Sequence, residues 1–147
     1  MQTFIALFLL LSALVIPVAS AEQRIVESGY EVHYNAFNSS FITPEVAQAN
    51  GLIRSKVMAL LNLSVLKVAA DGSTTPVSAV VRGEARNLLQ QIRPIEFTKI
   101  DEGDAIYYIG SFRFSDEEMM NFTLTVQPTP DITPIEVRFS QTFYEDR

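Results

Sequence analysis

Residues 57–68, VMALLNLSVLKV, decide the fold of this chain. In an extended strand, every second side chain points to the same face, so Leu61, Leu63 and Val65 lie together and the residues between them face the other way. Both faces are largely apolar, which is typical of a central strand covered on both sides. We therefore expect this run to lie in the middle of a β-sheet.

Shorter runs with the same two-residue period lie on both sides of it. Tyr30, Val32 and Tyr34 alternate with polar residues, and further runs occupy 77–81, 95–99, 106–114, 122–126 and 137–143. Turn signals such as Asp71-Gly72 separate them, Gly83 suggests a break or bulge, and the prolines of 128–134 predict a rigid loop or edge crossing. About seven strands predict an all-β fold, an antiparallel immunoglobulin-like β-sandwich. A barrel is the alternative.

One or two short helices are expected between the strands. Thr43-Pro44-Glu45 has the form of an N-cap, a first-turn proline and an acidic residue, and Gly51 supplies a stop, so residues 44–50 predict two helical turns. The sequence from Ser115 to Glu118 fits a capping box and predicts a second helix start.

The first 21 residues predict an export signal. Phe4 to Val18 is an apolar run of 15 residues, shorter than the roughly 20 that span a bilayer. Ala19-Ser20-Ala21 then predicts cleavage after Ala21. We expect a periplasmic protein with one domain over residues 22–147 and no stable membrane insertion after signal removal. An uncleaved N-terminal anchor is the alternative.

Composition excludes several classes of site. The chain of 147 residues has no Cys and a single His, so thiolate chemistry, disulfides and multi-His metal centres are excluded, and no cofactor motif is present. Its net charge of −6 argues against binding nucleic acid. The acidic cluster at 101–104 lacks the ligand spacing of a calcium loop and predicts a solvated turn.

The segment from His33 to Pro44 is the candidate site. It leaves a strand and enters a helix through consecutive polar residues flanked by Phe37 and Phe41, a combination that can hydrogen-bond and stack on a small ligand or peptide. The structural alternative is a crossover in which the polar side chains bond to local backbone and the two phenylalanines close the end of the sandwich. The candidate ligand- or partner-binding residues are His33, Tyr34, Asn35, Asn38, Ser39, Ser40 and Arg54.

The same segment carries a family resemblance. The residues from Tyr30 to Glu45, followed by Gly51-Leu52-x-Arg54-Ser55-Lys56 and the run from Leu60 to Val65, resemble an uncharacterised family of small exported gammaproteobacterial proteins, catalogued as a domain of unknown function. The resemblance covers essentially the whole mature chain. It implies a periplasmic β-sandwich and implies no activity, cofactor or catalytic residue.

These observations favour a non-enzymatic binding or assembly module whose partner is another envelope protein or a small ligand. No catalytic or metal-binding residue is assigned. One alternative is a small hydrolase or lyase that uses His33, the one imidazole base, with Tyr34 or a nearby Ser. The other is a carbohydrate- or lipid-binding sandwich with Tyr107 and Tyr144 on an open face.

Overall fold

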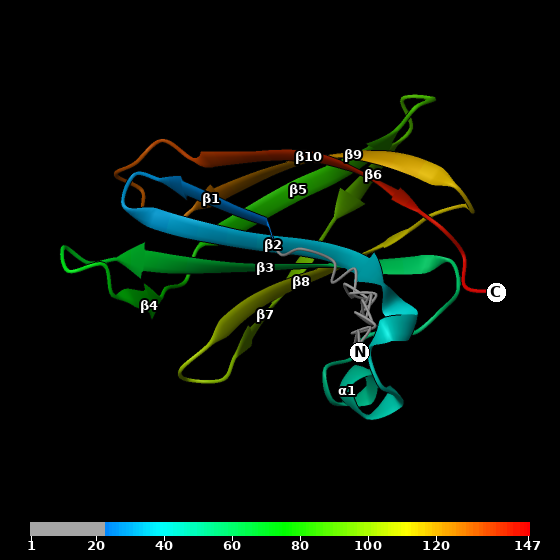
Figure 1. The fold of residues 1–147 in the computed structure, drawn as a ribbon, viewed down its shortest axis with the longest axis horizontal. Coiled ribbons are helices and arrows are strands. Elements are labelled where there is room, and N and C mark those ends of the chain that lie inside the picture. Colours follow the sequence, from blue (N-terminus) through cyan, green and yellow to red (C-terminus); the bar gives the residue numbers. More distant parts are fainter. Residues whose placement is uncertain (1–22) are drawn as a thin grey trace, which may run out of the picture.

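The protein is a sandwich of two antiparallel sheets in a computed structural model, which describes residues 23–147 (Figure 1). The predicted signal peptide and its cleavage site therefore lie outside the described residues. One sheet has the order β1-β2-β3-β8-β7, with β4 also paired to β3, and the other has the order β10-β9-β5-β6. The predicted all-β antiparallel sandwich is confirmed, and its immunoglobulin-like subtype stays a prediction.

Ten strands and two short helical elements make up the described chain, where about seven strands were expected. The extra strands are short, with three to five residues each. The elements are β1 (Gln23–Glu27), β2 (Tyr30–Asn38), η1 (Ser39–Phe41), α1 (Pro44–Ala49), β3 (Met58–Val68), β4 (Thr74–Pro76), β5 (Val80–Asn87), β6 (Ile92–Ile95), β7 (Phe97–Asp101), β8 (Ile106–Arg113), β9 (Glu118–Gln127) and β10 (Ile135–Phe143).

Strand β3 is central, as its two apolar faces predict. It lies between β2 and β8, and Leu61, Leu63 and Val65 are fully buried on its inner face. Leu60 is fully buried on the opposite face, where the η1 turn contacts β3. The outer face is apolar at this end of the strand and half-buried and polar farther along, at Asn62.

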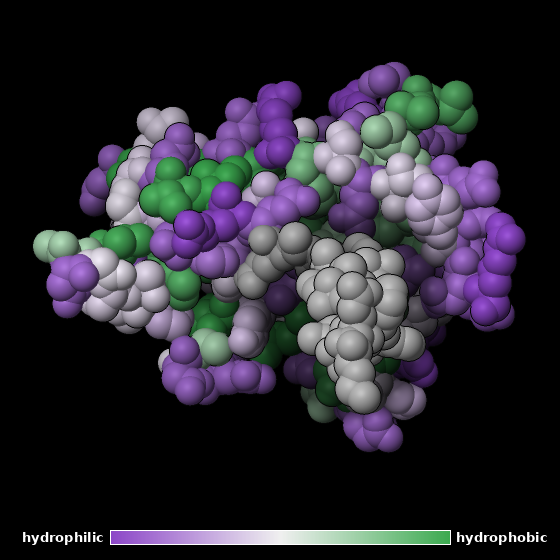
Figure 2. Space-filling view, viewed as in Figure 1, coloured by the Kyte–Doolittle hydropathy of each residue, from purple (hydrophilic) through white to green (hydrophobic). Residues whose placement is uncertain are grey.

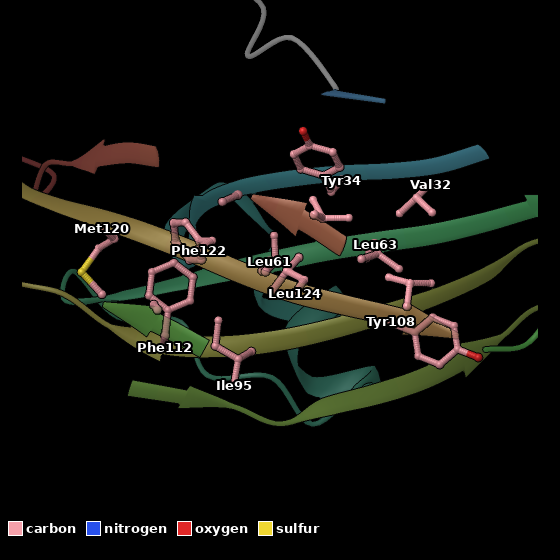
Figure 3. Packing of buried hydrophobic residues seen from close by; sticks show 14 of the residues in the cluster. Val32, Tyr34, Leu61, Leu63, Ile95, Tyr108, Phe112, Met120, Phe122 and Leu124 are labelled. Atoms are coloured by element: carbon pink, nitrogen blue, oxygen red, sulfur yellow. The ribbon is translucent and has the colours of Figure 1, made fainter. Parts of the chain in front are cut away.

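The core lies between the sheets and is rich in aromatic rings (Figure 3). Phe122 of β9 stacks on Phe139 at 4.5 Å between centroids and meets the edge of Phe112 at 5.1 Å. Tyr34 of β2 lies 4.9 Å from the same Phe139 ring, so aromatic contacts join the two sheets. Such contacts stabilise beyond the area they bury, by about 0.5–1.5 kcal/mol per pair.

The chain crosses between the sheets at Glu96. Ile95 ends β6 in one sheet and Phe97 begins β7 in the other, so the single strand expected over 95–99 is two strands. Gly110 of β8 makes room for this crossing, because a Cβ there would overlap the Cγ2 of Ile95. The alternating pattern is unbroken at this point, which is why the sequence does not reveal the crossing.

Two local predictions are wrong. Residues 115–118 form a turn in which Glu118 N donates to Ser115 O at 3.1 Å, so no helix begins there and Glu118 opens β9. Gly83 lies inside a continuous β5–β9 ladder without a bulge. A glycine is needed there because the side chain of Leu124 fills the space that a Cβ would need. The first motif therefore forms a turn between two strands, and the glycine allows close packing of side chains on the sheet.

The predicted helix after Thr43 is confirmed. Thr43 Oγ1 accepts a hydrogen bond from Val46 N at 3.2 Å, Pro44 occupies the first turn, and the helix ends at Ala49. Within residues 23–147, no helix is both long and apolar enough to cross a membrane.

Candidate functional site

The structure separates the seven predicted site residues into four places. Tyr34 packs in the core, where it is 7% exposed. Burial raises the pKa of its phenol above the ordinary value. It therefore lines no surface site, and the alternating period that buries it also places its neighbours His33 and Asn35 on the opposite face of β2.

His33 belongs to a polar patch on the outer face of β2 and β3. Its Nε2 lies 3.0 Å from Oε2 of Glu31, and Arg24 of β1 approaches the same carboxylate at 3.6 Å. Ser64 is the cross-strand partner of His33. Asn35 likewise stands opposite Asn62, whose Oδ1 is buried without a hydrogen-bond partner. Among the described residues, no three His, Cys, Asp or Glu side chains gather as a metal would need.

Ser39 and Arg54 secure the crossover after β2. Ser39 is fully buried, its Oγ donates to Ser55 O at 3.0 Å, and it accepts from Ser55 N at 2.8 Å. Arg54 Nη2 donates to Ser40 O at 3.3 Å. These bonds satisfy the buried hydroxyl and hold residues 39–40 against 54–55, as the structural alternative for this segment requires.

Asn38 and Ser40 bind the C-terminal tail, residues 144–147, which the sequence did not indicate. Asn38 Nδ2 donates to Tyr144 O at 2.7 Å and to Oδ1 of Asp146 at 3.3 Å, and Ser40 Oγ donates to the other oxygen of Asp146. Linear sequence carries no signal for this pairing, because 106 residues separate Ser40 from Asp146.

The tail is also tied to the β8–β9 turn. Glu145 N donates to Oδ1 of Asp116 at 2.8 Å, and the Arg147 guanidinium lies 3.8 Å from the other oxygen of that carboxylate. Figure 1 shows the tail descending from β10 across the end of the sandwich. Contacts between exposed polar groups contribute little each, so the tail is held in place by several weak bonds.

A groove runs between the end of β2, the end of β10 and this tail. It has a volume of about 380 Å³, and Gln141 Nε2 bridges its sides by donating to Ala36 O at 2.9 Å. Two aromatic side chains stand open on it, Phe41 at 75% and Tyr144 at 59% exposure. The lining residues are Ala36, Phe37, Asn38, Phe41 and 141–147.

This combination of side chains matches the recognition of an extended polar chain. Exposed rings offer stacking and apolar contact, and the Asn and Gln amides can both donate and accept hydrogen bonds. Of the two aromatics proposed as an open platform, Tyr144 lies at this groove, while Tyr107 is half-buried on β8. We therefore take the groove as the candidate functional site.

Three comparisons place the chain among known proteins. The family model described as "Domain of unknown function (DUF4426)" matches residues 26–146. A crystal structure of a DUF4426 family protein from Pseudomonas aeruginosa PAO1 is 34% identical, with a TM-score of 0.73, and the match covers 86% of this chain and 97% of that one. No curated protein matches.

The fold also resembles FetP of uropathogenic Escherichia coli strain F11, which was expressed recombinantly in the periplasm of E. coli. The identity is 12%, the TM-score is 0.60, and the match covers 86% of this chain and 96% of FetP. A copper-bound variant of FetP with one substitution gives the same identity and TM-score, with 85% and 96% covered. At this identity the likeness concerns the fold.

Proposed function

Because this chain belongs to the DUF4426 family of unknown function, we propose a function from its own groove: it is an exported, non-enzymatic binding module that holds an extended polypeptide segment of an envelope partner. The observation that carries this proposal is the groove between β2 and β10, with Phe41 and Tyr144 exposed on it. Large exposed aromatic side chains beside convergent amides are typical of protein recognition sites.

Strand β10 supports a polypeptide as the ligand. It is the edge strand of its sheet and pairs with β9 over nine consecutive residues without a bulge. Its sequence contains no proline. A long regular edge can accept a further strand through main-chain hydrogen bonds, while the groove beside it selects side chains. The aromatic groove and the end of this edge share residues 141–143.

Export through the predicted signal peptide supports a periplasmic site of action, as does the resemblance in fold to FetP. No copper site is carried over from FetP. The likeness concerns the fold alone, and among residues 23–147 the donor set lacks a cluster of three metal-ligating side chains.

The proposal is tested by a photo-cross-linking residue placed at Tyr144 or Phe41 in cells. We expect both positions to form the same defined adduct, because both line the groove. Val26, which is 61% exposed on β1, serves as the matched control and should form none. The double substitution Phe41→Ser, Tyr144→Ser should weaken capture by the purified partner at least about tenfold. Equal labelling at all three positions contradicts the proposal.

One observation favours hydrolysis as a second candidate function. Glu31 holds Nε2 of His33 at 3.0 Å, and Ser64 stands opposite His33 on the neighbouring strand, so a carboxylate, an imidazole and a hydroxyl share one face. Tyr34, also considered as a partner of His33, points the other way into the core. Full retention of a cellular phenotype by His33→Gln would exclude this function.

A further inference from the structure

The turn between β5 and β6 exposes an unusual amount of apolar surface. Leu88 is 67% and Leu89 79% exposed, and Ile92 of β6 and Met119 of β9 beside them are 48% and 39% exposed. We call these four residues the leucine tip. The turn projects beyond the sheets in Figure 1, and Figure 2 shows hydrophobic surface at the same corner. Leaving so many large apolar side chains in water is unfavourable unless something covers them.

Four backbone amides of this turn donate to acceptors within the turn. The Oδ1 atom of Asn87 accepts from Leu89 N at 3.1 Å and from Gln91 N at 2.9 Å. Gln90 N donates to Asn87 O at 3.0 Å, and Asn87 N donates to Gln91 O at 3.2 Å. Peptide groups bonded in this way can leave water at little cost, which is the condition that a lipid environment imposes.

The charges at the base of the turn are paired as well. Arg86 lies 3.4 Å from Glu84, and Arg93 pairs with Glu118 while donating to Arg113 O at 2.7 Å. No charged residue occurs between Arg86 and Arg93 in the sequence. The charged groups at the base of the turn therefore already have partners within the protein, and the apolar side chains project beyond them.

Both turns beside the leucine tip hold a residue at positive φ. Within residues 23–147, three non-glycine residues have positive φ, and two of them, Gln90 at 63° and Glu117 at 58°, lie in these turns. Such conformations persist only where the surrounding structure determines them, so the backbone beneath the apolar side chains is held in one conformation.

We propose that the leucine tip docks on the surface of a lipid bilayer and places its leucines in the interfacial layer. This contact is peripheral and reversible, consistent with the expected lack of stable membrane insertion. A shallow cleft of about 280 Å³ between Leu88, Leu89 and the 115–119 turn offers room for part of an acyl chain. Because Glu117 is exposed at the rim, the attraction is apolar and needs no anionic lipid.

The chain contains no Trp, which makes a direct test possible. The substitution Leu89→Trp introduces a single indole at the tip. With vesicles of phosphatidylethanolamine and phosphatidylcholine, its emission should shift to the blue and be quenched by brominated acyl chains. Val80→Trp is the matched control, because Val80 is 56% exposed at the start of β5, the strand whose other end leads into the turn. Its emission should stay unchanged.

Two further readouts complete the test. Leu88→Ser with Leu89→Ser should reduce co-flotation with vesicles at least about tenfold, with the melting temperature retained. Adding phosphatidylglycerol should leave binding of the wild-type chain unchanged or weaker. No emission shift for Leu89→Trp overturns the proposal, as does an equal shift for Val80→Trp. A shift that depends on protein concentration and not on lipid also overturns it, and would assign the tip to self-association.

Discussion

Two turns of this molecule have similar backbone geometry but expose different side chains. The 69–73 turn and the 87–91 turn each reverse the chain between antiparallel strands, and in each an Asx side chain accepts from the backbone two residues later, at 2.9 Å in Asp71 and 3.1 Å in Asn87. Each also holds one residue at positive φ, Gly72 in the first and Gln90 in the second. The first turn is polar at its tip, whereas the second carries Leu88 and Leu89.

The comparison separates folding from function. The polar turn shows that a hairpin in this fold needs an Asx acceptor and a left-handed position, and no apolar residue at the tip. The two leucines of the other turn therefore contribute nothing that the hairpin requires. The proposed contact with a bilayer gives them a role outside the hairpin.

The largest effect is expected from removing the buried Asx side chain, that of Asn87. Asn87 is 3% exposed and makes three side-chain hydrogen bonds within the turn. Asn87→Ala should lower the free energy of unfolding by about 2–3 kcal/mol, because all three hydrogen bonds of this buried side chain are lost. Asp71→Ala should lower the free energy of unfolding by clearly less, since water can replace the exposed hydrogen bonds that Asp71 accepts from Ser73. Urea denaturation of both variants measures the difference, and equal losses would refute it.

The second effect is a pH dependence at Glu118 of β9, which pairs with Arg93 beside the 87–91 turn. The hydrogen bond from Arg93 is the main reason that the pKa of Glu118 lies below its ordinary value, and Asn87 adds a further bond. A lowered pKa in the folded state means that Glu118 stabilises above the unfolded value of 4.5 and that this stability is lost as the pH falls through the folded value.

Glu118→Gln should therefore lower stability by about 1–2 kcal/mol at pH 7 and by progressively less below pH 4.5. Urea titrations at a series of pH values give the two curves. Parallel curves down to acid pH would show that the carboxylate charge has no part in holding the 115–118 turn.

Exchanging the left-handed residues of the two turns sharpens the comparison further. Gln90→Gly should raise stability by about 0.5–1 kcal/mol, because glycine adopts positive φ without a Cβ penalty. Gly72→Ala should lower it by about 1 kcal/mol for the same reason. Thermal denaturation detects both changes, and an unchanged melting temperature for Gly72→Ala would contradict the assumed strain.

The smallest effect on stability is expected at the leucines themselves. Leu88→Ser with Leu89→Ser should change the free energy of unfolding by less than about 0.5 kcal/mol, since both side chains are exposed. A larger loss, measured by the same denaturation, would mean that the leucines support the hairpin and would remove the contrast between the two turns.

The sequence predicts the long elements of this fold well. The alternation around Tyr30 to Tyr34 and the two apolar faces of 57–68 follow from burial, which repeats with the period of the strand. The capping box at Ser115 misled because the same residue types satisfy a β-turn, where Glu118 pairs with Arg93. Arg93, the partner of Glu118 in this turn, lies 25 residues away in the sequence, so the local motif does not reveal the pairing.

The candidate site was predictable in part. Of the polar run from Asn38 to Ser40, only Asn38 lines the groove, whereas Ser39 is fully buried in the crossover. Tyr144 was identified as an open aromatic, but its position beside Phe41 depends on how the last strand meets β2. The exposure of Leu88 and Leu89 could not be predicted, since an apolar pair in the sequence does not indicate whether the turn around it leaves the pair in solvent.

The crossing at Glu96 has a mechanical consequence for the whole sandwich. Because Ile95 and Phe97 belong to different sheets and Ile95 packs closely against Gly110, one short segment ties the two layers together at this point. In hydrogen exchange, the amides of β6 and β7 should open together, as one cooperative unit that spans both layers.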